Sequence, residues 1–326
     1  MRLSVLGGGS WGTALAAHAV SAGHELRIWV RSPGVAVALN DRRENPAYLP
    51  GVELPAGLRA TTNLGEAVSD AEAVIVAVPS EYCREIYRRA VTLLPTGVLL
   101  VSATKGLETD SLQRMTEVAM SEAPAHPLAV LSGPSFALEV AKSLPTAVVV
   151  ASHDHADAER VQRAFATGSF RVYTSEDVIG VELAGAVKNV IAIAAGIVDG
   201  LGYGHNTVAA LITRGLAEIA RLAGALGGRP DTLAGLAGLG DLVLTCTGGL
   251  SRNRTVGQRL GRGLSLAQAC AGIHAEGVRT TLAAVALAER HGIDLPIARQ
   301  MQAVLYAGKP PREALEELML RSLKRE

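Results

Sequence analysis

Short apolar runs of four to six residues recur through the first half of the chain. Their length and their content of branched aliphatic residues are typical of buried strands. The predicted strands cover residues 3–6, 25–30, 58–62, 73–78, 98–103, 128–131, 146–151 and 170–174. Most of these runs alternate with segments of helical pattern, so they predict βαβ units in a doubly wound parallel sheet that is buried on both faces.

The strand signal stops after Thr174. From about Asp177 onward the pattern is helical, and Gly-rich breaks interrupt it near residues 200–204, 224–229, 235–240 and 308–311. We therefore predict an α/β domain at residues 1–176 and an all-helical domain at residues 177–326. Because no Pro- or Ser-rich spacer separates them, we expect tight packing and a ligand site in the crevice between the two domains.

The first predicted strand leads into the turn Gly7-Gly8-Gly9-Ser10-Trp11-Gly12, which an Ala-rich helical segment follows. This order of strand, glycine turn and helix is what the pyrophosphate of a dinucleotide requires, as in a Rossmann-type domain. Gly7 permits the tight turn, Gly9 lets the backbone approach the phosphates, and Gly12 brings the helix against the strand. The N–H groups at the helix N-terminus receive the anion. The alternative is an ordinary strand-to-helix turn.

The end of the second predicted strand indicates which dinucleotide binds. NAD-selective sites usually carry an Asp or Glu there that binds the ribose 2′-hydroxyl. The sequence Trp29-Val30-Arg31-Ser32 has no such acid. Arg31 would instead meet a 2′-phosphate, so we expect NADPH to be preferred and NADH also to be possible. The alternative for Arg31 is an ordinary surface arginine.

Composition narrows the functional class. The chain has 326 residues, of which 48% are hydrophobic, and its formal net charge is zero. These values predict a two-domain globular enzyme that binds no nucleic acid. The three cysteines have no CxxC spacing, so we expect a reducing, cytoplasmic setting without a signal peptide. The longest apolar stretch, residues 190–198, is too short for a membrane span.

No metal site is expected. The sequence His153-Asp154-His155 has no third ligand nearby and follows a strand, so we interpret it as a polar connection. The pair His274 and Glu276 likewise gives no zinc pattern.

Three predicted strand ends carry unusual residues, and ligands of open α/β sheets bind at such ends. They are Pro79-Ser80, Lys105-Gly106 and the turn 133–137, which reads Gly-Pro-Ser-Phe-Ala. That turn would offer backbone N–H donors to an anion or to the nicotinamide amide, although it is also compatible with a proline-initiated helix. Lys105 lies where a substrate would bind, and a solvated loop lysine is the alternative.

Lys188 is the strongest single candidate, because it lies in the apolar helical segment 181–198. A buried ammonium needs either a carboxylate partner or a lowered pKa suited to proton transfer. Glu182, six residues earlier, does not share its face of the helix well. A lysine whose head reaches water is the alternative. Asn189 beside it would hold either the helix end or a substrate hydroxyl.

A carboxylate partner for Lys188 is available in a later segment. Asp241 begins an apolar helical run, and Thr245 falls on the same face one turn later. Asp241 is also compatible with a simple N-cap. Further on, Ser251-Arg252-Asn253 would bind a phosphate through its side-chain donors, the alternative being a solvated helix start.

These residues lie within a series of ordered blocks that covers essentially the whole chain. The blocks are GGGSWGTALA, NPAYLPGVELP, SATKGLE, LSGPSFALEV, VELAGAVKNVIAIAAG, ALITRG, GLGDLVLTCTG, SRNR and AEGVRTT. In these blocks the chain resembles the bacterial NAD(P)-dependent sn-glycerol-3-phosphate dehydrogenases. The resemblance implies a Rossmann domain followed by a helical domain like the C-terminal domain of 6-phosphogluconate dehydrogenase. It departs at Gly204-His205-Asn206, where relatives often carry Asp before the Asn.

The resemblance also implies a role for individual residues. Cofactor contacts are implied for Ser10, Trp11, Arg31, Lys105, Ala137, Arg252 and Glu276. Substrate contacts are implied for Lys105, Gly133, Ser135, Lys188, Asp241, Ser251, Arg252 and Asn253. The implied reaction is reduction of dihydroxyacetone phosphate to sn-glycerol 3-phosphate, which supplies glycerophospholipid synthesis, by a homodimer.

In the resulting hypothesis, Lys188 protonates the alkoxide that forms when the nicotinamide delivers hydride to the ketone. Lys105 adds positive charge beside that oxygen, while Asp241 and Thr245 position Lys188. A related β-hydroxyacid dehydrogenase and a nucleotide-sensing module without turnover are the alternatives. The predicted phosphate-binding residues 251–253 argue against the first.

Overall fold

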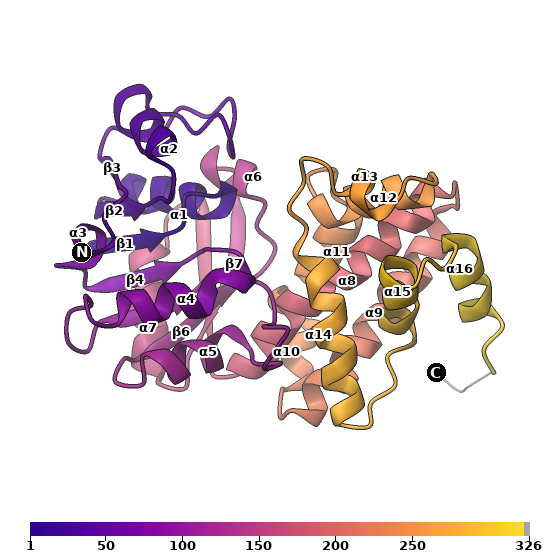
Figure 1. Ribbon diagram of the computed structural model, residues 1–326. Coiled ribbons are helices and arrows are strands. Elements are labelled where there is room, and N and C mark those ends of the chain that lie inside the picture. Colours follow the sequence, from indigo (N-terminus) through magenta and orange to yellow (C-terminus); the bar gives the residue numbers. More distant parts are fainter. Residues whose placement is uncertain (323–326) are drawn as a thin grey trace. The chain divides into compact units, whose positions relative to one another are not determined.

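The computed structural model describes residues 1–322 and divides the chain into two compact units (Figure 1). The first unit contains Met1–Lys105 and Gln113–Glu182. The second contains Gly106–Leu112 and the chain from Leu183 onward. The chain therefore passes from one unit to the other three times, after Lys105, after Leu112 and after Glu182.

The first unit is built on an eight-stranded sheet in the order β3-β2-β1-β4-β5-β6-β7-β8. The strands are β1 (Arg2–Leu6), β2 (Glu25–Trp29), β3 (Leu58–Thr61), β4 (Ala73–Val76), β5 (Leu99–Ser102), β6 (Leu128–Ser132), β7 (Thr146–Ala151) and β8 (Phe170–Ser175). All eight predicted strands are present, and the predicted doubly wound sheet is confirmed.

The sheet has one antiparallel pair that the apolar pattern did not reveal. Strands β1 to β6 are parallel, β7 pairs antiparallel with β6, and β8 is parallel to β7. The physical reason is that a buried strand is apolar on both faces whichever way it runs, so its sequence does not encode its direction.

Helices cover both faces of the sheet, as the continuous apolar runs of the strands predict. One face packs against α1 (Ser10–Ser21), α6 (Ala137–Ala141) and α7 (His155–Phe165). The other packs against α3 (Leu64–Val68), α4 (Ser80–Ala90) and α5 (Met115–Glu122). Neighbouring residues of one strand serve opposite faces, so Val5 lies in the first core and Leu6 in the second. The short helices α2 (Pro33–Val37) and η1 (Ala38–Arg42), a π-helix, follow β2.

From Leu183 onward, the regular secondary structure in the described residues of the second unit consists of helices, as the pattern predicts. Its elements are α8 (Val178–Gly200, which begins in the first unit), α9 (His205–Ala225), α10 (Pro230–Ala234), the π-helix η2 (Leu236–Gly240), α11 (Asp241–Thr247), α12 (Arg252–Gly261), α13 (Leu266–Ala269), α14 (Glu276–Arg290), α15 (Pro296–Tyr306) and α16 (Pro311–Met319).

Helix α8 is the core helix of this unit. By length and composition alone its 23 residues could cross a membrane, but 94% of its most apolar window is buried inside the fold. It packs backbone to backbone against α12, since a Cβ on Gly196 would lie 2.0 Å from the Arg254 carbonyl oxygen. In the reverse direction, a Cβ on Gly257 would lie 2.0 Å from the Ile193 carbonyl oxygen. Glycine at both positions therefore permits a helix contact that any side chain would prevent.

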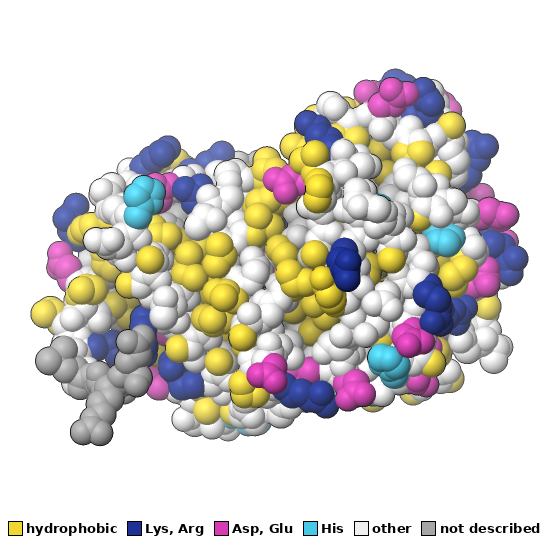
Figure 2. Space-filling model, turned by 180° about the vertical axis from the view of Figure 1, so that it is seen from behind, with side chains coloured by type: hydrophobic (Ala, Val, Ile, Leu, Met, Phe, Trp, Pro, Cys, Tyr) yellow, Lys and Arg dark blue, Asp and Glu magenta, His cyan; other side chains and the backbone are white. Residues whose placement is uncertain are grey.

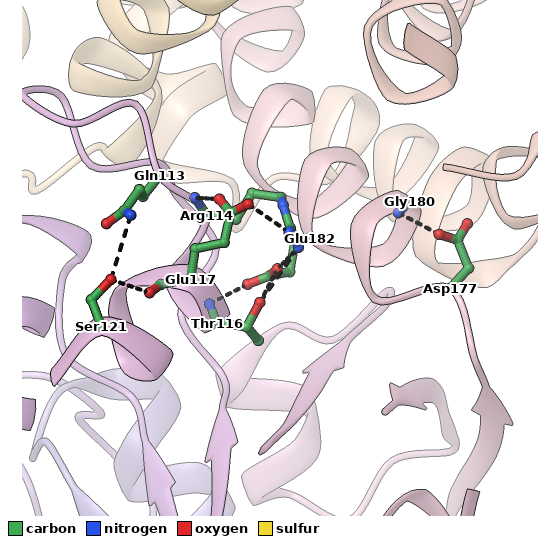
Figure 3. Close-up of polar contacts among 8 residues, drawn as sticks. All are labelled: Gln113, Arg114, Thr116, Glu117, Ser121, Asp177, Gly180 and Glu182. Carbon is green, nitrogen blue, oxygen red and sulfur yellow. Dashed lines mark hydrogen bonds and ion pairs between the residues drawn. The ribbon is translucent and has the colours of Figure 1, made fainter. Parts of the chain in front are cut away.

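Near its N-terminus, α8 is fixed by Glu182, whose side chain is buried and whose contacts are drawn in Figure 3. Its carboxylate accepts hydrogen bonds from Arg114 Nη1 at 2.6 Å, Thr116 N at 2.8 Å and Thr116 Oγ1 at 2.6 Å. Arg114 also pairs with Glu117, with 2.8 Å between Nη2 and Oε1. Burial raises the pKa of Glu182, while Arg114 and the two Thr116 donors oppose that rise. Charge-assisted hydrogen bonds thus anchor the helix that carries Lys188.

The molecular surface carries charges of both signs. On the face seen in Figure 2, basic and acidic side chains are interspersed among hydrophobic and neutral ones. This mixture agrees with the formal net charge of zero.

Candidate active site

The glycines of the turn in the first unit differ in their surroundings: Gly7 and Gly12 are required by the fold, whereas Gly9 faces open space. Gly7 has φ +126°, and a Cβ on Gly12 would lie 1.9 Å from the Gly7 carbonyl oxygen. Both glycines are therefore required by the fold. A Cβ on Gly9 would meet no protein atom within 4 Å. Gly9 is also the N-cap of α1 and has no side chain to cap the helix, so the turn fits a phosphate group approaching the N-terminus of α1.

The other predicted cofactor residues of this unit lie around the same turn or at the end of β2. Ser10 Oγ donates a hydrogen bond to the Tyr48 carbonyl oxygen at 2.5 Å. Trp11, in the first turn of α1, is partly buried and packs against the sheet core. Arg31 is exposed, and its Cζ lies 6.0 Å from the centre of the Tyr82 ring.

Lys105 contacts the turn 133–137 through the carbonyl group of Gly133. Lys105 Nζ donates to the Gly133 oxygen at 2.8 Å, and Ser135 Oγ donates to the same oxygen at 3.0 Å. Lys105 is half-buried and is therefore not a solvated loop lysine. The turn is also not a proline-initiated helix, because α6 begins at Ala137 with Phe136 as its N-cap. Helix α6 packs against α1, which places Ala137 on the same sheet core as Trp11.

The second unit holds a buried lysine with a carboxylate and a hydroxyl. Lys188 is 5% exposed, and its Nζ lies 2.5 Å from Asp241 Oδ1 and donates to Thr245 Oγ1 at 2.7 Å. Thr245 Oγ1 in turn donates to the Asp241 carbonyl oxygen at 2.6 Å. The sequence left open whether Lys188 has a carboxylate partner or only a lowered pKa, and the structure shows that Asp241 is such a partner.

Asp241 does not act as a helix cap. Gly240 occupies the N-cap position of α11, and Asp241 is the first helical residue. The carboxylate is 1% exposed and is turned toward Lys188. Because a buried charge without a partner is strongly unfavourable, each member of this pair stabilises the burial of the other.

Asn253 connects the segment 251–253 to Asn189, which follows Lys188 in α8. Asn253 Nδ2 donates to Asn189 Oδ1 at 2.9 Å, and Asn253 Oδ1 accepts from the Gly277 backbone N at 2.9 Å. Ser251 caps α12 by accepting from Arg254 N at 3.2 Å. Ser251 and Asn253 are buried, so this is not a fully solvated helix start.

Arg252 is the exposed member of that segment. Desolvation by the surrounding protein lowers the pKa of Arg252, and the Glu276 carboxylate opposes that effect. Glu276 is the first residue of α14 and precedes the Gly277 that Asn253 binds. The second unit thus gathers the predicted residues Lys188, Asn189, Asp241, Thr245, Ser251, Arg252, Asn253 and Glu276.

The histidine pairs have ordinary structural surroundings. Asp154 caps α7 by accepting from Ala156 N at 2.9 Å, and His274 Nε2 lies 3.3 Å from Glu276 Oε1. Within residues 1–322, no group of three or more His, Cys, Asp or Glu side chains could hold a metal ion.

Several contacts around these residues were not anticipated. The bonds from Arg114 and Thr116 to Glu182 are one case. A carboxylate in an apolar helix does signal a buried partner, but nothing marks Arg114 among the other arginines. Asn45 is another case: its Nδ2 donates to the Gly8 carbonyl oxygen at 3.0 Å, and this contact depends on how the loop between η1 and β3 folds.

Comparisons with known proteins identify the family of this chain. The family model for the N-terminus of NAD-dependent glycerol-3-phosphate dehydrogenase matches residues 2–158, and the model for its C-terminus matches residues 177–316. The chain is 52% identical over 332 residues to a glycerol-3-phosphate dehydrogenase (NAD(P)+) of Nitratidesulfovibrio vulgaris strain Hildenborough, covering 100% of both. It is 50% identical over 330 residues to one of Geobacter sp. strain M21, covering 100% of this chain and 98% of the relative.

A solved structure supports the same assignment. The crystal structure of glycerol-3-phosphate dehydrogenase from Coxiella burnetii is 40% identical and superposes with a TM-score of 0.95, covering 98% of this chain and 99% of that one. The chain therefore belongs to the NAD-dependent glycerol-3-phosphate dehydrogenase family.

Proposed function

We propose that this protein reduces dihydroxyacetone phosphate to sn-glycerol 3-phosphate with NADPH or NADH, and thereby supplies glycerophospholipid synthesis. The observation that carries the proposal is the buried contact of Lys188 with Asp241 and Thr245, in a chain of this family. A paired ammonium is a proton donor that a protein can keep away from water until a substrate binds.

We assign the proton transfer to Lys188. When bound, the reduced nicotinamide supplies a hydride, which ends on the ketone carbon. As the C=O bond becomes C–O⁻, Lys188 Nζ gives its proton to that oxygen, so the product is a neutral hydroxyl and the lysine becomes a neutral amine. Asp241 and Thr245 hold Nζ throughout, and Lys105 adds positive charge where the oxygen becomes negative.

Substrate binding is assigned to two groups of residues. The guanidinium of Arg252, with Ser251 and Asn253 at the N-terminus of α12, would bind the phosphate. Asn189 would meet a substrate hydroxyl. Gly133 and Ser135 would bind substrate beside Lys105. Phosphate binding energy that is remote from the reacting carbon orients the carbonyl.

Cofactor binding is assigned mainly to the first unit, with residues 1–176 as the dinucleotide-binding domain and residues 177–326 as the catalytic domain. The residues proposed to contact the dinucleotide are Gly7, Gly9, Ser10, Trp11, Gly12, Arg31, Lys105, Ala137, Arg252 and Glu276. We further propose a cytoplasmic homodimer; the free cysteines Cys83, Cys246 and Cys270 support a reducing compartment.

The direct test is loss of the reduced-nicotinamide absorbance when purified protein, NADPH or NADH, and dihydroxyacetone phosphate are mixed. We expect turnover with this substrate and much less with dihydroxyacetone, which lacks the phosphate. Oxidation of 3-hydroxyisobutyrate with NAD+ or NADP+, followed as a gain of the same absorbance, with no turnover of dihydroxyacetone phosphate, would indicate a β-hydroxyacid dehydrogenase instead. Cofactor binding without any turnover would indicate a sensing module.

Replacing Arg31 by alanine is expected to weaken the preference for NADPH over NADH. Loss of a hydrogen-bonded charge contact to the 2′-phosphate costs about 1.5–3 kcal/mol. The KM for NADPH, relative to the KM for NADH, should therefore rise by about 10-fold or more. Arg89→Ala is the matched control, because Arg89 is an exposed arginine whose Cζ lies 5.7 Å from the Trp29 ring centre. An unchanged ratio in Arg31→Ala would remove the assignment.

A further inference from the structure

A loop between η1 and β3 is hydrogen-bonded to the glycine turn and to the start of α1. We call residues 43–54 the strap. Its backbone closes on itself where Leu54 N donates to the Arg43 carbonyl oxygen at 2.8 Å, and a β-bridge joins Asn45 to Leu49. Leu49, Val52 and Leu54 are buried in the same core as α1. The strap is therefore a packed part of the first unit.

Asn45 connects the strap to the glycine turn. Its side chain is fully buried, and its Nδ2 donates to the Gly8 carbonyl oxygen at 3.0 Å and to Thr13 Oγ1 at 2.8 Å. The bond from Ser10 Oγ to the Tyr48 carbonyl adds a third connection. The strap thus holds residues on both sides of Gly9, the glycine that faces open space.

The amide of Asn45 is only half satisfied. Within residues 1–322, its Oδ1 is buried and has no hydrogen-bond partner. A buried acceptor without a partner is unfavourable for stability, so the residue is not explained by stability alone. What distinguishes asparagine here is the pair of N–H donors that face Gly8 and Thr13.

The hydrogen bond from Asn45 to the Gly8 carbonyl oxygen also fixes the direction of the Gly9 N–H group, which belongs to the same peptide. A trans peptide is planar, so its C=O and N–H point in opposite directions. While Asn45 holds the carbonyl of Gly8, the N–H of Gly9 must point away from the strap. Neither residue has a Cβ, so without this bond the peptide between them could rotate at little steric cost. A rotated peptide would turn its carbonyl oxygen toward an approaching phosphate and repel it.

We propose that Asn45 is a positioning residue for dinucleotide binding, which acts by preventing rotation of the Gly8–Gly9 peptide. The proposal rests on the proposed function only in that the ligand at the turn is a dinucleotide. Asn45 does not touch the reacting atoms, so its loss weakens cofactor binding and leaves the chemical step intact.

The test compares Asn45→Ala with a matched asparagine at the other end of this region. Asn40 Nδ2 donates to the Ala60 carbonyl oxygen and Asn40 Oδ1 accepts from Ala60 N, both at 2.8 Å, so it holds β3 and not the glycine turn. We expect Asn45→Ala to raise the Kd for NADPH, titrated without substrate, by about tenfold. At saturating NADPH, kcat and the KM for dihydroxyacetone phosphate should stay within about twofold of the wild type. Asn40→Ala should leave the Kd unchanged.

Asn45→Ser keeps one donor and should give an intermediate Kd; it also serves where the alanine variant does not fold. Independently, ¹⁵N relaxation dispersion should show the Gly9 amide of the ligand-free wild type in one conformation. An unchanged Kd in Asn45→Ala, an equal rise in Asn40→Ala, or exchange of the wild-type Gly9 amide between two conformations would overturn the proposal. A wild type that neither binds NADPH nor reduces dihydroxyacetone phosphate would instead refute the proposed function.

Discussion

Lys188→Ala is expected to lower kcat for dihydroxyacetone phosphate reduction by about 10²–10⁴-fold, the range over which a positioned proton donor acts. The Kd for NADPH, measured by titration without substrate, should change little. The physical reason is that hydride transfer to a ketone leaves an alkoxide, and the variant lacks the buried donor that would protonate it. Steady-state kinetics at saturating cofactor and substrate measure the effect.

Controls are needed because the substitution also leaves the Asp241 carboxylate buried without its partner. Such a charge is destabilising, so lost activity could come from lost structure. The double variant Lys188→Met with Asp241→Asn removes both charges and should recover thermal stability without recovering turnover. Lys142→Ala, on an exposed lysine, should behave like the wild type. Turnover near the wild-type rate in Lys188→Ala would refute the proton-transfer role.

Glu182→Ala is expected to lower the free energy of unfolding by about 3–5 kcal/mol, as is usual when one partner of a buried ion pair is removed. Arg114 Nη1 would lose its carboxylate partner and keep only the 3.4 Å contact with Thr116 Oγ1, and the Thr116 N and Oγ1 donors would lose their acceptor. Urea unfolding followed by far-ultraviolet circular dichroism measures the change.

Glu117, the second carboxylate that pairs with Arg114, provides a matched control. Glu117 also pairs with Arg114 but is more exposed, so Glu117→Ala should cost only about 1 kcal/mol. The double variant Arg114→Met with Glu182→Leu should be more stable than either single variant, because apolar residues can replace a buried pair. Equal losses in Glu182→Ala and Glu117→Ala would contradict the anchoring role of Glu182.

The elements of this fold are predictable because burial leaves a direct pattern in the sequence. All eight strands appear as apolar runs, and α8 appears as a helix that is apolar nearly all round. The direction of β7 is not predictable in this way, because reversing a strand whose apolar run is continuous leaves its pattern unchanged. In β8, buried and exposed residues alternate, and this alternation also reads the same in both directions.

The residues of the candidate site were predictable to a different degree. A lysine in an apolar helix needs either a carboxylate partner or a lowered pKa, unless its head reaches water, and Asp241 with Thr245 one turn later is a possible partner. The sequence therefore predicts this contact as one of several possibilities, and the structure shows it. Asn253 was predicted only as a phosphate donor, whereas its amide joins Asn189 to Gly277. Such bridges join segments that are distant in sequence, and their pairing depends on packing that no local pattern encodes.

The three passages of the chain between its units restrict how the protein can be dissected. A single cleavage after Glu182 would leave residues 106–112 in the N-terminal fragment, although their contacts are with the helical unit. Neither fragment would then be a complete unit: one would carry a segment without its environment, and the other would lack that segment. Expression of either half alone should therefore yield poorly folded protein, and domain exchange between relatives would have to transfer residues 106–112 together with the helical part.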